Sequence, residues 1–540
     1  MKDNLNIKVD CTGMNRLEII ESLLNSRGIE NEIEFLSISE NDLIPFENMK
    51  NLEKGFDMLY DSIFANYSNK DKVLIHADVD VDGLTSYSIM FQYLENYRPE
   101  NRIKATITKG KVHGIEDYDL SNLDDVDLMI IVDSINDLKD YKRILETGTK
   151  ILILDHHITS KDLIEFEKNS EDICLISSAN DYINSQLSGA GVVWKFCKYF
   201  DEMTLNNFSD NLVDLAMTGI IADMCNISAE NRENRYICYK GLINIKNPVL
   251  KEFSKGYTFN SETVSYGIAP FVNSAMRMLR NDDVLNIFNL KDNKEIKRKI
   301  EYLKEIKQQQ SEETDRLLAM AEIKDYGKVA IAIIDNNQYN LKGLIANKIM
   351  ADVQKPILCI TEYNNDNEHY YSGSARGIGI DNFLKVMEDT ECIDFAKGHE
   401  NSFGVKIPYD KFNECIKKIE TTLKDLELKN DIHIDAKIKP YQITNSLLDD
   451  IERISVVTGE GYKPYKFLVE LYNDNYVIST IKDTHLKITS GDISFIKWND
   501  NDIEKYRDKD IVIIGTLNKN VFAGKVQKQI IVDKIIIKEV

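Results

Sequence analysis

The stretch KVLIHADVDVDG, residues 72–83, decides the fold class of this chain. A short apolar run leads directly into a loop with three aspartates, and the same order recurs in LMIIVDS, which ends at Ser134, and in ILILDHH, which ends at His157. Helix-like patterns at residues 85–97 and 137–147 separate these runs. Alternation of this kind predicts βαβ units that build a parallel sheet with helices on both faces.

Acidic and imidazole side chains follow the predicted strands. The carboxyl ends of parallel strands meet at one edge of a sheet, where open α/β sheets bind ligands. A further aspartate ends a helical pattern at residues 211–222. The set is large enough for two adjacent divalent metals, and oxygen donors with no accompanying cysteine favour Mn²⁺ or Mg²⁺ over zinc. Its members are His76, Asp80, Asp82, Asp133, Asp155, His156, His157 and Asp223.

The same residues, in the same order, resemble the DHH phosphoesterase superfamily, named for the triplet that is Asp155-His156-His157 here. Other segments are similar to those of RecJ-type single-strand exonucleases. With them, the resemblance covers roughly residues 60–425. These segments are GIAPFVNSAMRML (267–279), YNLKGLIANKI (339–349), SGSARGIGID (372–381) and KGHENSFG (397–404).

The resemblance implies a phosphodiesterase site with two Mn²⁺ or Mg²⁺ ions. Two metals about 3.5–4 Å apart can bind the attacking water and a phosphate oxygen of the substrate. We expect Asp133 to bridge the ions, His157 to point at the phosphate, and Asp78 to act as a ligand or a base. The expected ligands are His76, Asp80, Asp82, Asp133, His156 and Asp223, and the expected catalytic residues are Asp78, Asp155 and His157.

The resemblance also implies a substrate-binding set, with Ser374 and Arg376 at the terminal phosphate of the strand. A snorkelling Arg277 and a surface salt bridge at Arg376 are the structural alternatives. The chain departs from the family at Lys397, where a glycine is usual, and at Ile115, where a tyrosine is usual. The expected set is Lys109, Lys111, Asn273, Arg277, Ser374, Arg376, Lys397 and His399.

The pattern of the whole chain predicts two α/β domains joined by a long helix, followed by a small β-barrel. A charged stretch free of glycine and proline predicts the helix, and short β-rich runs between Asn, Asp and Gly turns predict the barrel. The expected parts are an N-terminal extension packing on the core (1–60), a DHH catalytic domain (61–290), the connecting helix (291–324), a DHH-associated substrate-binding domain (325–430) and an oligonucleotide-binding-type, or OB-like, barrel (431–540).

Composition limits the partners and the compartment. The 540 residues carry a formal net charge of −22, which counts against indiscriminate nucleic-acid binding, so a DNA substrate requires a locally basic track. The eight cysteines are scattered, and no apolar run approaches the length of a membrane span. The first ten residues lack the apolar core of a signal peptide. We therefore expect a cytoplasmic monomer, in a bacterial or phage-infected bacterial cell, with no membrane association.

Three functional hypotheses follow. The first is a metal-dependent 5′-to-3′ exonuclease on single-stranded DNA that serves repair, recombination or replication, with a single-strand-binding protein or a helicase as candidate partners. The second is a nanoRNA or cyclic-dinucleotide phosphodiesterase of the same superfamily; the extra barrel favours the first hypothesis over it. The third is a non-catalytic replication scaffold, and the intact acidic set argues against it because unused, mutually repelling ligands destabilise a fold.

Overall fold

The computed structural model describes residues 2–64, 72–108, 114–116, 118–255, 258–335, 340–364, 368–426, 428–522 and 525–538. Lys109 and Lys111, two of the predicted substrate-binding residues, lie outside these ranges. Contacts divide the chain into two compact units. Unit 1 comprises Met1–Asn6, Arg277–Leu279 and Lys304–His433, and unit 2 comprises Ile7–Met276, Arg280–Leu303 and Ile434–Val540.

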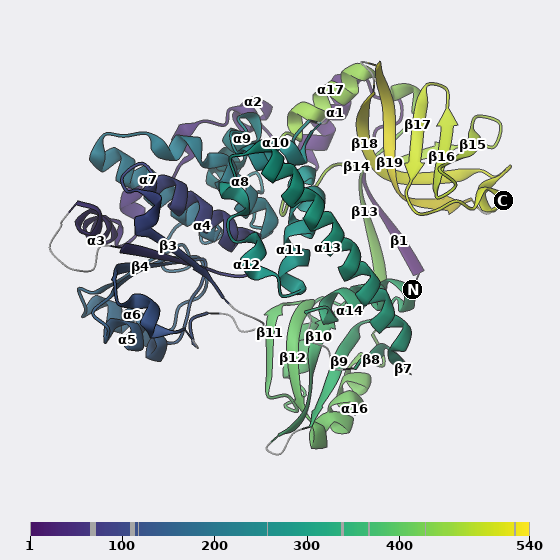
Figure 1. Ribbon diagram of the computed structural model, residues 1–540. Helices are drawn as coiled ribbons and strands as arrows, with labels where there is room; N and C mark the ends of the chain where they lie inside the picture. Colours follow the sequence, from purple (N-terminus) through teal and green to yellow (C-terminus); the bar gives the residue numbers. More distant parts are fainter. Residues whose placement is uncertain are drawn as a thin grey trace. The chain divides into compact units, whose positions relative to one another are not determined.

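A five-stranded parallel sheet lies at the centre of the first half of unit 2 (Figure 1). Its order is β3-β2-β4-β5-β6. All of β6, and all but the first residue of β2 and of β5, are buried, as expected for parallel strands covered on both faces. The strands are β2 (Lys72–Ala77), β3 (Ile103–Ile107), β4 (Val126–Val132), β5 (Lys150–Asp155) and β6 (Ile173–Ser177).

Helices cover both faces of this sheet, which confirms the predicted layering. Helices α5 and α6 share an apolar core with one face, and α3, α4 and α7 contact the strands from the other side (Figure 1). These helices are α3 (Leu52–Phe64), α4 (Val81–Leu94), α5 (Leu138–Leu145), α6 (Lys161–Lys168) and α7 (Gly189–Thr204). Five further helices follow: α8 (Val213–Ala222), α9 (Arg232–Ile243), α10 (Pro248–Phe253), α11 (Ala269–Arg277) and α12 (Asn281–Val284).

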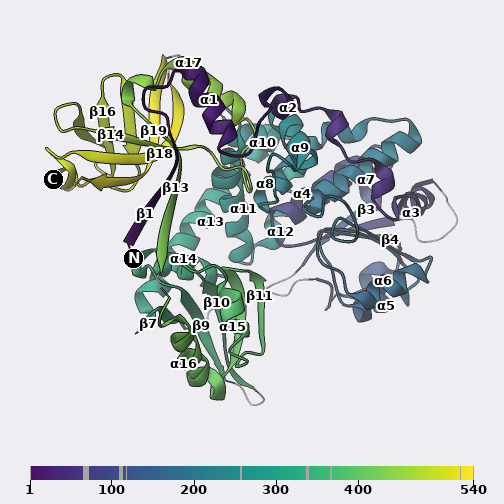
Figure 2. The ribbon, with the colours of Figure 1, turned by 180° about the vertical axis from the view of Figure 1, so that it is seen from behind.

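The C-terminal part of unit 2 is rich in strands (Figure 2). An antiparallel meander of β15, β16 and β17 joins the β18–β19 hairpin through a parallel β17/β19 ladder. This arrangement is compatible with an OB-like domain. The elements are β13 (Lys429–Ile438), α17 (Asn445–Ile454), β14 (Lys466–Leu471), β15 (Val477–Ile481), β16 (His485–Ser490), β17 (Ile493–Lys497), α18 (Ile503–Tyr506), β18 (Ile511–Phe522) and β19 (Lys525–Ile537).

The N-terminal segment belongs structurally to this C-terminal region. Strand β1 (Lys2–Asp10) lies beside β13, and α1 (Arg16–Asn25) packs on α17. Apolar side chains of α1 and α2 (Glu32–Leu36) share one core with the barrel strands. Arg27 fixes the junction, because its guanidinium binds both oxygens of Asp435 and stacks 3.6 Å from the Tyr465 ring centroid.

A six-stranded sheet of order β11-β12-β10-β9-β8-β7 forms unit 1. Helices α15 and α16 share an apolar core with one face, and α14 contacts β9 and β10. The elements are β7 (Glu322–Tyr326), β8 (Val329–Ile333), α14 (Lys342–Val353), β9 (Ile357–Asn364), β10 (His369–Arg376), α15 (Phe383–Glu388), β11 (Phe395–His399), β12 (Ser402–Pro408) and α16 (Phe412–Leu423).

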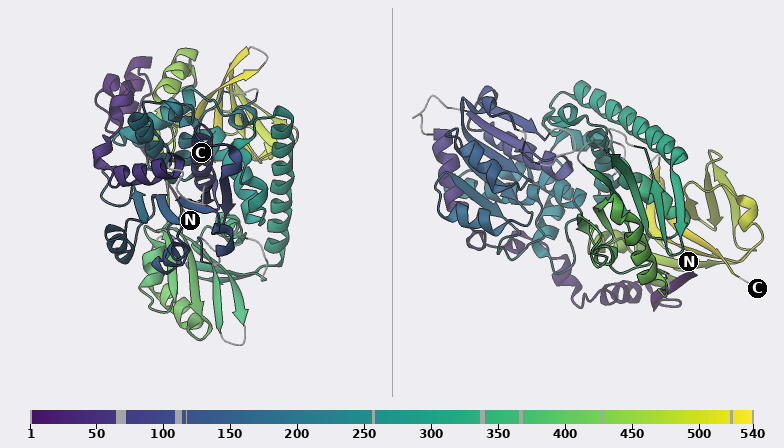
Figure 3. Two further views of the ribbon diagram at one scale, coloured as in Figure 1. Left: turned by 60° about the vertical axis from the view of Figure 1, so that its left-hand side comes forward. Right: turned by 90° about the horizontal axis from the view of Figure 1, so that it is seen from below.

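The predicted connecting helix is present as α13 (Asn293–Met320), which Figure 3 shows as one continuous helix. It is shorter than the expected 291–324 because the chain turns into β7 at Glu322. Its buried residues include Ile296, Ile300 and Leu303, at the spacing of one helix face. Among the described residues, no helix is both long enough and apolar enough to cross a membrane.

Candidate metal centre and anion-binding face

Each predicted metal ligand of unit 2 lies where an element begins or ends. Asp80 is the N-cap of α4 and accepts a 2.9 Å hydrogen bond from the Gly83 amide. Asp133 directly follows β4, with a left-handed backbone (φ 56°), and Asp155 is the last residue of β5. Asp223 is the C-cap of α8, where the sequence pattern predicted a helix end. Element ends therefore bring these side chains to one edge of the sheet.

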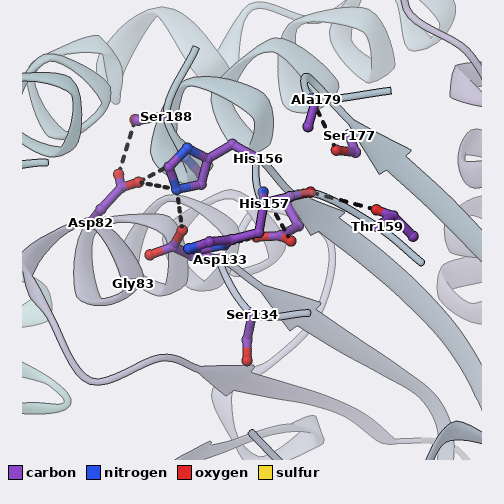
Figure 4. Close-up of polar contacts among 12 residues, drawn as sticks. Asp82, Gly83, Asp133, Ser134, His156, His157, Thr159, Ser177, Ala179 and Ser188 are labelled. Atoms are coloured by element: carbon purple, nitrogen blue, oxygen red, sulfur yellow. Dashed lines mark hydrogen bonds and ion pairs between the residues drawn. The ribbon is translucent and has the colours of Figure 1, made fainter. Parts of the chain in front are cut away.

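The imidazole of His156 lies among three of the predicted carboxylate ligands. Its Nε2 is 3.2 Å from Asp133 Oδ1, 3.8 Å from Asp223 Oδ2 and 3.9 Å from Asp82 Oδ2. Figure 4 shows the ring edge between the carboxylates of Asp82 and Asp133. These residues come from α4, β4, β5 and α8, so four separate elements converge on one position.

The carboxylates at this position are buried with little compensation. Burial, reinforced by Asp82 and Asp80, holds the pKa of Asp133 well above its usual value. Burial and then the neighbouring Asp78 raise the pKa of Asp80 to about 6. Asp133 Oδ1 is buried and accepts no hydrogen bond within the described part of the chain. A divalent cation fits this donor set, because it would supply the missing partner and offset the repulsion between the carboxylates.

Asp82 is held in place by the N-terminus of α7. Its carboxylate accepts hydrogen bonds from the Ser188 hydroxyl (3.0 Å) and from the amides of Gly189 (2.7 Å) and Ala190 (3.0 Å). The positive end of the helix dipole favours the charged carboxylate at this place. Sequence analysis missed these residues, although SGAG before a long apolar stretch is a recognisable N-cap signal.

His157 is paired with Asp155. Its Nδ1 lies 2.9 Å from Asp155 Oδ1, and its backbone amide donates to Asp155 Oδ2 at 3.2 Å. The bond to Asp155 raises the pKa of His157 to about 9. The imidazole is 48% exposed, whereas the Asp155 side chain is fully buried. This geometry leaves a cationic imidazole facing solvent beside the carboxylate cluster.

His76 differs from the other predicted ligands. Its Nδ1 lies 2.9 Å from the Thr106 hydroxyl and its Nε2 lies 3.2 Å from the Thr108 hydroxyl. Burial lowers the pKa of His76 to about 4, so the ring is neutral. An ion bound by His76 would have to displace one of the threonine contacts. The structure therefore places His76 beside the cluster, and its role as a ligand stays a prediction.

One cysteine accompanies the carboxylates, which corrects the expectation that none does. The Cys225 thiol donates a 3.4 Å hydrogen bond to Asp223 Oδ2, and ligand atoms of Cys225, Asp223 and His156 all lie within 4.8 Å of one another. Sequence analysis missed Cys225 because a cysteine two residues after an aspartate matches no metal motif. Only the turn that ends α8 brings the two side chains together.

Four of the predicted substrate-binding residues share one face of the unit 1 sheet. Ser374 pairs with Gly404, which pairs with Lys397, and Arg376 reaches His399 in the same way through Ser402. Directly paired residues point to the same side of a sheet. Ala375, the residue between Ser374 and Arg376, lies in the core under α15 and α16, so these side chains point to the opposite face.

Arg376 makes only uncharged contacts in the described structure. Its Nε donates to Asn347 Oδ1 at 2.9 Å, and its Nη1 donates to the Ala375 carbonyl at 2.7 Å. Burial and the nearby Arg277 lower the pKa of Arg376. Burial also lowers the pKa of Arg277. Neither guanidinium is part of an ion pair among the described residues, so the alternative of a surface salt bridge at Arg376 is not supported. Asn273, on α11, has a buried Oδ1 without a hydrogen-bond partner in the same part of the chain.

Comparison with known proteins identifies the first of these regions. Residues 72–220 match the family model described as "DHH family, N-terminal domain". Residues 72–220 are a DHH domain. The DHH domain contains the five-stranded sheet and the predicted metal ligands up to His156, and Asp223 follows its end by three residues.

Relatives of this DHH protein extend the likeness beyond the DHH domain. A Bacillus subtilis (strain 168) protein, provisionally named as the SPβ prophage-derived single-strand DNA-specific exonuclease YorK, is 28% identical over 95% of this chain and 94% of its own length. The single-stranded-DNA-specific exonuclease RecJ of the same organism is 23% identical over 96% of this chain and 68% of its own length. The RecJ–Mn²⁺ crystal structure from Thermus thermophilus covers the whole chain and 81% of its own with a TM-score of 0.75 at 18% identity, which establishes a RecJ-like fold.

Proposed function

We propose that this protein is a metal-dependent exonuclease that degrades single-stranded DNA from its 5′ end. The observation that carries the proposal is the buried, partnerless Asp133 Oδ1 beside His156 Nε2, at 3.2 Å, within a crowd of carboxylates. The names of its relatives, YorK and RecJ, support single-stranded DNA as the substrate. The Mn²⁺ and Mg²⁺ in related RecJ structures support the choice of metal.

Two ions are the proposed complement, held by Asp80, Asp82, Asp133, His156 and Asp223, with His76 as a further candidate. When bound, Mn²⁺ or Mg²⁺ supplies Lewis acidity that activates water for attack on phosphorus. Asp82 orients the site because three donors at α7 fix its carboxylate. His157, kept protonated by Asp155, presents positive charge to a phosphate oxygen.

The strand end is proposed to bind at Ser374 and Arg376, with Arg277 as a second cation. A phosphate offers these guanidinium groups the anionic partner that the described residues do not provide. Lys397 and His399, on the neighbouring strand, extend the same face. The OB-like region is the proposed holder of longer strands. Roles in repair, recombination or replication, and docking with a single-strand-binding protein or helicase, remain part of this proposal.

The test is incubation of the full chain with Mn²⁺ and end-labelled single strands of DNA and of RNA, each with and without a 5′ phosphate. We expect mononucleotides from the 5′ end of DNA, fastest with a 5′ phosphate, and complete inhibition by a chelator. Asp133→Asn and a fully duplex DNA serve as controls, and neither should yield product. Hydrolysis confined to short RNA would favour a nanoRNA phosphodiesterase, and no hydrolysis of any strand would favour the scaffold hypothesis.

A further inference from the structure

Cys225 lies at the predicted metal centre because of the way α8 ends. The Cys225 amide donates to the Ile220 carbonyl at 3.0 Å, and the Met224 amide donates to the Ile221 carbonyl at 3.3 Å. Met224 has a left-handed backbone (φ 57°). These are the features of a Schellman turn, with Asp223 as the C-cap. The turn fixes the backbone on both sides of Met224, and the Asp223 and Cys225 side chains meet as a result.

The distances in this group match tetrahedral coordination of a thiophilic ion. Zinc–sulfur, zinc–oxygen and zinc–nitrogen bonds of about 2.3, 2.1 and 2.0 Å, at tetrahedral angles, separate sulfur from oxygen by about 3.6 Å and nitrogen from oxygen by about 3.4 Å. Cys225 Sγ is 3.4 Å from Asp223 Oδ2, and that oxygen is 3.8 Å from His156 Nε2. Little movement is therefore needed for all three atoms to bind one ion.

A second observation independently points to a cation here. Asp133 Oδ1 is buried and accepts no hydrogen bond within the described residues, although it lies 3.2 Å from the same His156 Nε2. The thiol itself is buried, at 7% exposure. The site thus offers one sulfur, one nitrogen and carboxylate oxygens from a protected position, which is a typical donor set for zinc.

We propose that Cys225 is a sulfur ligand for thiophilic divalent cations, Zn²⁺ or Cd²⁺, which bind together with His156 and Asp223 in place of Mn²⁺ or Mg²⁺. On binding, a sulfur–metal bond forms, the thiol proton passes to solvent, and no electron is transferred. Because His156 and Asp223 are then occupied, such an ion inhibits the nuclease. The proposal rests on the metal-binding part of the proposed function and is independent of the nucleic-acid substrate.

The test follows the thiolate-to-cadmium charge-transfer absorbance while metal-free, full-length protein is titrated with Cd²⁺. We expect a band that saturates at one ion per chain. Cys225→Ser should lose the band and bind Cd²⁺ and Zn²⁺ at least about tenfold more weakly, equivalent to about 1.4 kcal/mol. Its Mn²⁺ affinity, measured by electron paramagnetic resonance, should stay within about twofold of wild type, because Mn²⁺ does not depend on a soft donor.

Cys238→Ser is the matched control, since Cys238 is an equally buried thiol on the neighbouring helix α9 and should leave the band intact. Cys225→Ala provides a second variant, and thermal melting identifies any variant that fails to fold. A wild-type protein without the band, or a folded Cys225 variant that keeps it, would overturn the proposal. Neither result depends on exonuclease activity, so failure of the proposed function is recognised separately by the hydrolysis assay.

Discussion

Asp133 combines a left-handed backbone, full burial and an unpaired carboxylate oxygen. Asparagine tolerates the left-handed region and has nearly the same shape, so Asp133→Asn removes the charge with little change in geometry. We expect loss of activity by more than about a hundredfold, since changes to groups that merely support metal ligands already cost about 10–100-fold.

The same variant should be more stable than wild type in the absence of metal, because one of several mutually repelling buried carboxylates is gone. Thermal melting with and without Mn²⁺ measures both effects. We expect a higher melting temperature for metal-free Asp133→Asn and a smaller increase on adding Mn²⁺. A Mn²⁺-induced increase equal to that of wild type would contradict a role for Asp133 in metal binding.

Arg376 is the residue whose substitution best tests recognition of the strand end. Arg376→Ala should weaken binding of 5′-phosphorylated strands more than that of 5′-hydroxyl strands by about tenfold or more, since a charge-assisted hydrogen bond contributes about 1.5–3 kcal/mol. Fluorescence anisotropy with metal-free protein measures both affinities without cleavage. Arg316→Ala removes an exposed arginine paired with Glu313 on α13 and should leave the ratio unchanged. Equal losses for the two strands would indicate a general backbone contact instead.

Among the helices, the crossing of α4, α7 and α8 sets the position of Asp82. A Cβ atom added at Gly219 of α8 would lie 2.2 Å from Asp82 Oδ1 and 2.5 Å from the Ala190 Cβ. The carboxylate cannot move away freely because the N-terminus of α7 holds it. Gly219 is therefore required for close helix packing at the metal centre.

Gly219→Ala should destabilise the protein by about 1–3 kcal/mol, the usual cost of overpacking. It should also weaken Mn²⁺ binding, because Asp82 is displaced. Urea denaturation and Mn²⁺ titration measure the two effects. Gly267→Ala is the matched control, since the nearest atom to an added Cβ there is 3.9 Å away. Unchanged stability of the Gly219 variant would mean that α8 shifts readily at this crossing.

For the whole molecule, the two chain ends fold together. Residues Ile19, Ile20, Leu23 and Phe35 share an apolar core with barrel residues such as Phe467. Arg235, on α9, stacks between Phe35 (4.3 Å) and Tyr462 (4.8 Å), which connects both ends to the helices beyond the DHH domain. The N-terminal extension is therefore not an appendage of the catalytic half alone.

Deleting residues 431–540 should leave the N-terminal segment without its core. Each large apolar side chain that loses burial costs about 1.5–3 kcal/mol, and a few such losses match the whole stability of a typical domain. We expect aggregation on size-exclusion chromatography and rapid proteolysis within residues 11–36. Trp498→Ala, which changes an exposed barrel side chain, should keep the wild-type elution and protease resistance. A monomeric, protease-resistant truncation would show that the shared core is dispensable.

The amino-acid sequence by itself determined the parallel sheet, the long helix α13 and most of the metal-type residues. Apolar runs of strand length followed by aspartates are local patterns, and local patterns survive without knowledge of packing. The helix end at Asp223 was predictable for the same reason. The placement of Ser374 and Arg376 on one face of a strand follows from the two-residue period of a strand.

Tertiary structure alone decided which atoms meet. Periodicity contains no information on contacts between distant elements, so the three donors from α7 to Asp82, the threonine partners of His76 and the thiol beside Asp223 were not predictable. The shared core of residues 11–36 with the barrel was hidden for the same reason, since an apolar helix face does not specify its partner. The sequence thus determined the elements and their chemistry, whereas packing decided which of those groups form the metal centre.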